Sequence, residues 1–290
     1  MSVSRSERGG RLFGCGTALV TPFLPGGEID EGIHFLVPCG STGEAATMSP
    51  AEHRRVVGIV VDQTRGRVPV VAGAGSNDTR RAVAMSREMR DAGATHLLHV
   101  SPMYNKPPQR GIVAHFRAVA EATELPVIVY NVPGRTGSNI EARTTLELAT
   151  VPNIVAIKEA SGNLPQIAEI LRARPPHFSV FSGDDALTLA VMASGGDGVI
   201  SVTSNATPRA MSELVERAAR SDMEGAREVH RSLAPWMSAA FVESNPIPVK
   251  AALAMQGRVR NELRLPLVPL LEEHGATVRD ALTAAGALAR

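Results

Sequence analysis

Short apolar runs rich in β-branched residues recur along the chain, and most of them are continuous rather than alternating with polar residues. Continuous runs of this length are typical of strands in a parallel sheet that is covered on both faces. The pattern predicts eight strands, at residues 15–20, 35–39, 68–72, 96–100, 127–130, 154–158, 179–182 and 199–202.

Amphipathic segments with apolar residues at helical spacing separate most of these strands. They predict helices at residues 52–64, 79–93, 111–123, 142–150 and 164–173, and residues 184–195 can supply another. Regular alternation of strand and helix over a chain of this length favours one (β/α)8 barrel, an α/β fold of the TIM-barrel type, over two domains.

Four more helices are predicted after the eighth strand, which is more than a barrel needs. They lie at residues 208–220, 223–238, 247–255 and 278–288. The sequence therefore predicts a polar N-terminal tail at residues 1–13, the barrel at residues 14–222 and a C-terminal helical domain at residues 223–290.

The segment between the first two strands breaks the pattern. Residues 21–33 contain Thr-Pro, Pro-Gly-Gly and Glu-Gly breakers, which leave room for barely one helical turn. A parallel crossover normally takes about a dozen residues or more, including its helix. We therefore expect the first crossover helix to be missing.

Composition and charge exclude several classes of protein. The 290 residues carry 30 Lys plus Arg against 29 Asp plus Glu, a net charge of +1, which argues against a nucleic-acid binder. The apolar runs are far shorter than the roughly 20 residues that span a bilayer, so no membrane association is expected. The polar, Arg-rich start lacks a secretion signal, and two cysteines are too few for a disulfide framework. A cytoplasmic protein is the expectation.

Lysine is rare enough to be informative. Among the 30 cationic residues only Lys106, Lys158 and Lys250 are lysines. A genome-wide preference for arginine explains most of this bias, but an amine that must lose its proton to react cannot be replaced by a guanidinium. Lys158 ends the sixth strand, where it is either a rim lysine in water or a desolvated amine that can form a Schiff base.

Other polar groups follow neighbouring strands, at the end of the barrel where active sites lie. Tyr130 ends the fifth strand beside Lys158 and could move protons, and Arg135 in the next loop could pair with a carboxylate. After the second strand, Ser41 and Thr42 lie between glycines that can aim backbone amides at an anion. Each of these features is weak alone. Together they indicate an enzyme for a small 2-oxo acid.

Neither a metal nor an organic cofactor is expected. His96 and His99 are three residues apart on a predicted strand, so they point to opposite faces. No glycine-rich run follows a strand in the way a nucleotide-binding loop requires. Lys158 would itself activate the carbonyl.

Six motifs match, in order, a known family. They are GSTGE at 40–44, YNKP at 104–107, YNVPGRTG at 130–137, IKEASGN at 157–163, SGDD at 182–185 and NPIPVK at 245–250. With them the chain resembles the dihydrodipicolinate synthase and N-acetylneuraminate lyase family from about Gly14 to its end, interrupted at residues 21–33. The resemblance implies a class I, Schiff-base-forming pyruvate aldolase or lyase, usually a homotetramer.

The resemblance also implies a role for each matching residue. Lys158 would form the imine with pyruvate, while Tyr130, the Ser41 hydroxyl and Tyr104 of a neighbouring subunit would relay protons. Thr42 would hold the pyruvate carboxylate and Arg135 the carboxylate of L-aspartate 4-semialdehyde.

Two further matching positions, Gly183 and Ile200, would line the site. An arginine at position 135 favours the synthases of the family, which serve lysine and diaminopimelate biosynthesis, over the sialic-acid lyases. The alternatives are another pyruvate-dependent aldolase, acting on sialic or 2-keto-3-deoxy sugar acids, and an inactive relative that only binds 2-oxo acids.

Members that are inhibited by lysine differ from this chain at the inhibitor site. Met103 replaces a second tyrosine, and Pro50, Arg81 and Ala45 stand where those enzymes place polar or acidic contacts. Because an arginine in place of an acid repels the ammonium of the ligand, we expect no inhibition by lysine.

Overall fold

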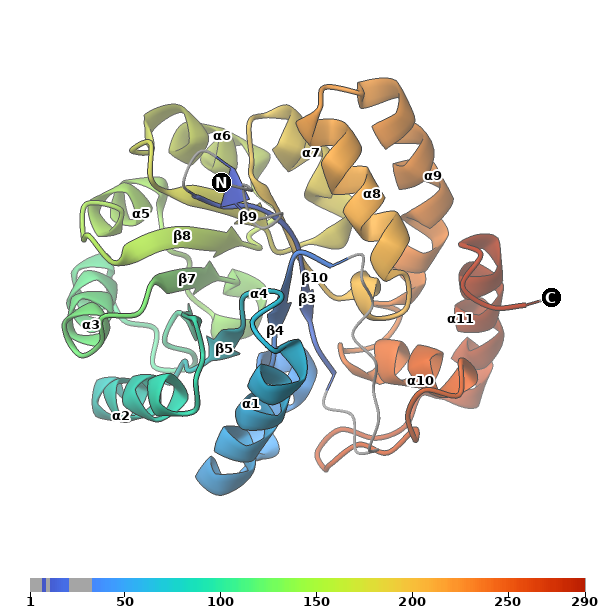
Figure 1. Ribbon diagram of the computed structural model, residues 1–290, viewed down its shortest axis with the longest axis horizontal. Coiled ribbons are helices and arrows are strands. Elements are labelled where there is room, and N and C mark those ends of the chain that lie inside the picture. The colour runs from blue at the N-terminus through green and yellow to red at the C-terminus, as the bar shows by residue number, and fades with distance from the viewer. Residues whose placement is uncertain (1–6, 9–10, 21–32, 290) are drawn as a thin grey trace.

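Eight parallel strands surround the centre of the molecule, and the computed structural model describes residues 7–8, 11–20 and 33–289 (Figure 1). The strands are β3 (Gly14–Ala18), β4 (Phe35–Val37), β5 (Val71–Gly73), β6 (His96–Val100), β7 (Val127–Asn131), β8 (Ile154–Glu159), β9 (Ser179–Ser182) and β10 (Gly198–Ser201). They confirm the eight predicted strands, with ends that shift by up to three residues.

Strand order gives the sheet the connectivity of a barrel. Neighbouring strands follow the order β4-β3-β10-β9-β8-β7-β6-β5. The two outer strands of that series also meet, through a parallel bridge between Leu36 and Val70 and a 3.0 Å hydrogen bond from the Gly73 N–H to the Pro38 carbonyl. The predicted (β/α)8 barrel is therefore confirmed.

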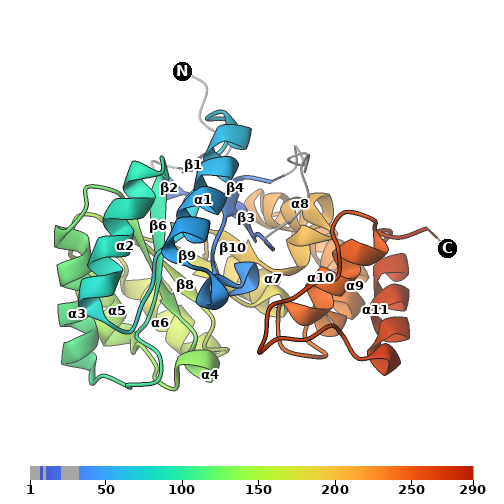
Figure 2. The same cartoon turned by 90° about the horizontal axis from the view of Figure 1, so that it is seen from below.

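Helices cover the outside of the strands (Figures 1 and 2). They are α1 (Pro50–Thr64), α2 (Thr79–Asp91), α3 (Gln109–Glu121), α5 (Ala142–Leu148), α6 (Leu164–Ala173), α7 (Thr188–Ala193) and α8 (Pro208–Ala219). A further short helix, α4 (Pro133–Thr136), lies at the end of the barrel, directly after β7. Helix α1 begins two residues before its predicted start because Ser49 and Glu52 form a reciprocal capping box. The short α4 was not predicted. The predicted lack of a first crossover helix concerns residues 21–33, which lie outside the described residues except for Ile33.

The N-terminal segment contains two short strands that the sequence pattern does not predict. Within residues 1–13, predicted as a polar tail, β1 (Glu7–Arg8) and β2 (Arg11–Leu12) pair in an antiparallel two-stranded sheet. Leu12 and Phe13 are buried, and the Leu12 carbonyl accepts a 2.9 Å hydrogen bond from the Ser179 hydroxyl at the start of β9. The side chain of Leu12 belongs to the apolar cluster inside the barrel.

The C-terminal extension contains α9 (Met223–Ala239), α10 (Ile247–Met255) and α11 (Glu272–Ala284), which gather on one side of the barrel next to α8 (Figures 1 and 2). The last helix begins six residues before its predicted start at 278, because Glu272 and Glu273 suit a helix N-terminus. The fully buried Trp236 donates from Nε1 to the Thr203 carbonyl at 3.1 Å. Since the extension and the barrel share this core, the boundary at 222–223 stays a prediction.

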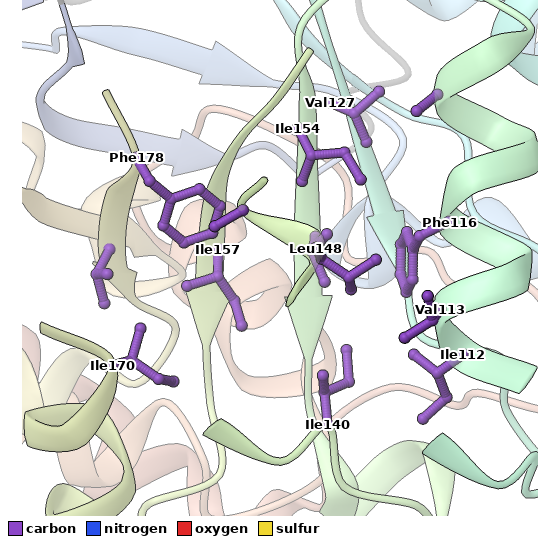
Figure 3. Close-up of a cluster of buried hydrophobic side chains, with 14 of the residues drawn as sticks. Ile112, Val113, Phe116, Val127, Ile140, Leu148, Ile154, Ile157, Ile170 and Phe178 are labelled. Carbon is purple, nitrogen blue, oxygen red and sulfur yellow. The ribbon is translucent and has the colours of Figure 1, made fainter. Parts of the chain in front are cut away.

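Two apolar layers fix which strand residues face inward. Figure 3 shows the outer layer, in which Ile154, Ile157 and Phe178 of the strand region belong to the same buried cluster as Phe116 of α3. Ala156 belongs instead to the cluster inside the barrel. Because side chains alternate along a strand, the position after Ile157 on β8 faces inward. That position is Lys158.

None of the helices in the described residues has the length and the apolar character that crossing a lipid bilayer requires.

Candidate active site

Lys158 lies at the inner, C-terminal end of β8 and is only 5% exposed. Tyr130 is its register partner on β7, and the Lys158 Nζ lies 4.4 Å from the centre of the Tyr130 ring. Burial lowers the pKa of Lys158 to about 8; the charge of Asp185 opposes this shift and that of Arg135 adds to it. A lysine with this pKa has a useful fraction of neutral, nucleophilic amine near neutral pH.

The same buried environment shifts the pKa of Tyr130 in the opposite direction. Burial raises the pKa of its phenol to about 12, although the positive charge of Arg135 works against the shift. The phenol therefore keeps its proton at neutral pH. It is placed to donate a hydrogen bond to an oxygen that develops charge beside the Lys158 amine.

Because Gly183 has no side chain, it leaves room for the side chain of Lys158. A Cβ at this position would lie 3.0 Å from the Lys158 Cε and 2.7 Å from the Ala160 Cβ. The Gly183 N–H donates to the Glu159 carbonyl at 2.7 Å, which holds the backbone close. Ile200 is fully buried inside the barrel, in the same apolar cluster as Tyr130.

Ser41 and Thr42 form a tight turn after β4, the 3-10 helix η1 (Ser41–Gly43). The Ser41 side chain is exposed, whereas Thr42 is 3% exposed. The Thr42 hydroxyl oxygen accepts a 2.9 Å hydrogen bond from the side-chain amide of Asn245. The hydroxyl hydrogen of Thr42 thus remains available for an anion.

Arg135 stands on α4, at the rim after β7, and its side chain is exposed. Its guanidinium donates to the main-chain carbonyl of Asn245 at 3.1 Å. Asn245 therefore connects the two groups that were predicted to bind carboxylates, Thr42 and Arg135. Sequence reasoning missed Asn245, although it opens the NPIPVK motif.

Tyr104 does not lie against Lys158 within this chain. Its side chain is 89% exposed and its backbone φ is 72°, in the left-handed region that non-glycine residues rarely adopt. A ring that is so exposed does not pack against a buried amine of the same chain.

A buried carboxylate near Lys158 was also missed. Asp185 is fully buried, and it accepts hydrogen bonds from the Ser201 hydroxyl and, at 3.0 Å, from the Val202 N–H. Burial raises the pKa of Asp185, and hydrogen bonds from Ser201 and the following backbone partly offset the shift. The signal was the second aspartate of the SGDD motif.

In the described part of the chain, no three His, Cys, Asp or Glu side chains come close enough together to hold a metal ion. What the barrel end brings together is a buried amine with a lowered pKa, a protonated phenol and hydroxyl donors. This set can form an imine with a small oxo acid and move protons around it.

Comparison with known proteins identifies relatives along nearly the whole chain. Residues 14–285 match the family described as the dihydrodipicolinate synthetase family. The 4-hydroxy-tetrahydrodipicolinate synthase of Koribacter versatilis is 48% identical, over 96% of this chain and 97% of its own.

Two solved structures have the same fold. The first is a dihydrodipicolinate synthase from Acinetobacter baumannii, complexed with pyruvate; it has a TM-score of 0.92 and 41% identity, and the match covers 95% of this chain and 99% of that one. The second is an enzyme from Cyanidioschyzon merolae with lysine bound; its TM-score is 0.90 and its identity 42%, over 95% and 99% of the two chains.

Proposed function

This chain belongs to the dihydrodipicolinate synthetase family, and on that premise we propose that it condenses pyruvate with L-aspartate 4-semialdehyde. The product would be 4-hydroxy-tetrahydrodipicolinate, an intermediate of lysine and diaminopimelate biosynthesis. The observation that carries the proposal is the buried Lys158 amine, 4.4 Å from the Tyr130 ring centre, at the catalytic end of a barrel.

The geometry supports a defined first step. The neutral amine of Lys158 attacks the keto carbon of pyruvate, and a proton delivered through Tyr130 allows the resulting hydroxyl to leave as water. The iminium that remains draws electrons from the methyl group, so loss of a methyl proton gives an enamine. The enamine carbon then attacks the aldehyde carbon of the second substrate.

Substrate binding is assigned to the rim. The Thr42 hydroxyl and the backbone of its turn hold the pyruvate carboxylate, and Ser41 takes part in proton relay. Arg135 holds the carboxylate of the aldehyde, since a guanidinium can make two parallel hydrogen bonds to it. Gly183 and Ile200 shape the space around the imine.

The relay is completed by Tyr104 from a neighbouring subunit. Its exposure of 89% leaves the ring available to enter another copy of this chain. A homotetramer acting in the cytoplasm, as expected from the sequence, remains part of this proposal. No metal and no organic cofactor is required.

Borohydride reduction in the presence of pyruvate tests the proposal. A stable adduct on the peptide that contains Lys158, together with turnover of aspartate semialdehyde, is the expected result. An adduct with turnover of sialic or 2-keto-3-deoxy sugar acids instead would identify another aldolase. An adduct without any turnover would identify an inactive relative that binds 2-oxo acids.

A further inference from the structure

One of the three lysines of the chain is buried but takes no part in the proposed chemistry. Lys250 on α10 is fully buried, and its Nζ lies 2.5 Å from Oε1 of Glu44, whose side chain is 2% exposed. Taking two charges out of water is costly, and well-packed apolar residues of similar volume often stabilise a fold equally well. Stability alone therefore does not explain why the chain has an ion pair at this position.

Glu44 directly follows the turn that was assigned to the pyruvate carboxylate. Its N–H donates to the Ser41 carbonyl at 3.2 Å, and its own carbonyl accepts from the Thr47 N–H at 3.0 Å. Glu44 thus joins η1 to the next short turn, η2 (Ala45–Thr47). Glu44 is therefore part of the backbone that places the Thr42 hydroxyl.

The backbone of Glu44 is in a strained conformation. Its φ of 55° and ψ of 32° lie in the left-handed region, where a non-glycine residue is strained and persists only if its surroundings hold it. The side chain supplies that hold through both carboxylate oxygens. Oε1 meets Lys250, and Oε2 accepts a 3.1 Å hydrogen bond from the Arg264 N–H.

Both of these anchors belong to the C-terminal extension. The Arg264 guanidinium adds further ties, to the Thr47 carbonyl at 3.1 Å and to the Glu52 carboxylate at 2.7 Å. Asn245, from the same extension, binds the Thr42 hydroxyl. Hydrogen bonds and ion pairs therefore connect the turn after β4 to the C-terminal extension at several residues.

We propose that the Glu44–Lys250 pair is a positioning device through which the C-terminal extension sets the geometry of the pyruvate-binding turn. The inference rests on the proposed function, since it takes the turn at Ser41 and Thr42 to hold the carboxylate. Neither Glu44 nor Lys250 touches substrate. Their effect is on how well the turn fits pyruvate, and the chemistry at Lys158 is left intact.

The test replaces the pair without leaving one buried charge alone. In the double variant Glu44→Gln with Lys250→Met, the Kd and KM for pyruvate should rise by about tenfold, whereas kcat at saturating pyruvate and the KM for the aldehyde should change less than about threefold. Glu44→Asp keeps both charges but shortens the link by one methylene, so it should fold and give a smaller rise in the same direction.

Asp197→Asn is the matched control. Asp197 is also a buried, ion-paired carboxylate, bonded to Arg174 and to the Val180 N–H, but it precedes β10 and lies at the opposite end of the barrel. It should lower the melting temperature without changing the Kd for pyruvate. That contrast separates positioning from general loss of stability.

The outcomes distinguish the two levels of inference. If the unmodified protein binds no pyruvate, by calorimetry and by borohydride trapping, the proposed function and this inference both fall. If it binds pyruvate but the double variant and Glu44→Asp bind equally well, the positioning role alone is overturned. A fall in kcat with an unchanged KM would also overturn it.

Discussion

Lys158 and Tyr130 are register partners on adjacent strands, with the lysine Nζ 4.4 Å from the centre of the tyrosine ring. The pair places an amine and a phenol side by side, and both side chains are largely buried. Burial shifts both pKa values toward the neutral form, down to about 8 for Lys158 and up to about 12 for Tyr130. Both groups are therefore uncharged over a wider range of pH than they would be in water.

The first prediction is that Lys158 destabilises the fold. Its pKa falls from 10.5 to about 8 on folding, so the folded state binds the proton less tightly than the unfolded state. Lys158→Met should raise the free energy of unfolding at pH 7 by about 1–3 kcal/mol, while it abolishes the pyruvate adduct.

The dependence of stability on pH provides a control for this prediction. Between about pH 8 and 10.5 the unfolded chain holds the Lys158 proton and the folded chain does not, so the stability of the unmodified protein rises with pH in this window. The advantage of Lys158→Met should be full below about pH 8 and shrink as the pH rises to 10.5. Equal melting temperatures at pH 7 would contradict the prediction.

The second prediction concerns the rate of imine formation. Because the pKa of Lys158 is about 8, the rate of pyruvate trapping with cyanoborohydride should rise with pH and level off above that value. The charge of Arg135 helps to lower this pKa, so Arg135→Gln should move the midpoint to higher pH. A midpoint near 10.5 in the unmodified protein would mean that the amine is solvated.

The third prediction tests the space beside Lys158. In Gly183→Ala the new Cβ would lie 3.0 Å from the Lys158 Cε, so the amine must move. Trapping of pyruvate should slow by about tenfold to a hundredfold, because such reactions depend on placement within about 1 Å. Gly58→Ala on α1 is the control, since a Cβ there meets nothing within 4 Å. Equal rates for the two variants would refute the constraint.

Inhibition by lysine is the fourth property to test, and we expect none. Arg81 and Pro50, two of the positions that differ from the lysine-inhibited members, are exposed. An exposed arginine repels the ammonium group, so calorimetry should detect no binding at about 1 mM lysine. The lysine-bound relative from Cyanidioschyzon merolae serves as the positive control. Half-inhibition below millimolar lysine would refute this expectation.

Much of the fold and of the site follows from local sequence pattern. The apolar run of β8 fixes its two faces, and that alone orients Lys158 inward beside Tyr130. The antiparallel pair of β1 and β2 was missed because these strands are two residues long and mostly polar. Asn245 and the Glu44–Lys250 pair were missed for another reason. They join residues about 200 positions apart, with separations of 203 and 206, and no local periodicity encodes such a contact.

The last prediction decides whether Tyr104 acts in its own subunit or in a neighbouring one. Tyr104→Phe removes the phenol from the proposed relay, and Lys158→Ala removes the proposed nucleophile, so each variant alone should be nearly inactive. When the two are co-expressed, a subunit with Lys158→Ala can still lend its intact Tyr104 to a neighbour that retains Lys158. Such a mixed pair contains one complete site out of two.

Random mixing of the two variants makes half of the pairs mixed, so activity should return to about one quarter of that of the unmodified enzyme. If Tyr104 acted within its own chain, no subunit of the mixture would contain both groups, and activity would stay at the level of the single variants. The control is a chain with both substitutions, co-expressed with the unmodified chain. In each mixed pair of this control, the only intact Lys158 receives Tyr104→Phe from its neighbour, so the pair contains no complete site. Recovery in the first mixture together with this loss in the second would assign Tyr104 to the neighbouring subunit, in agreement with a ring that is 89% exposed in its own.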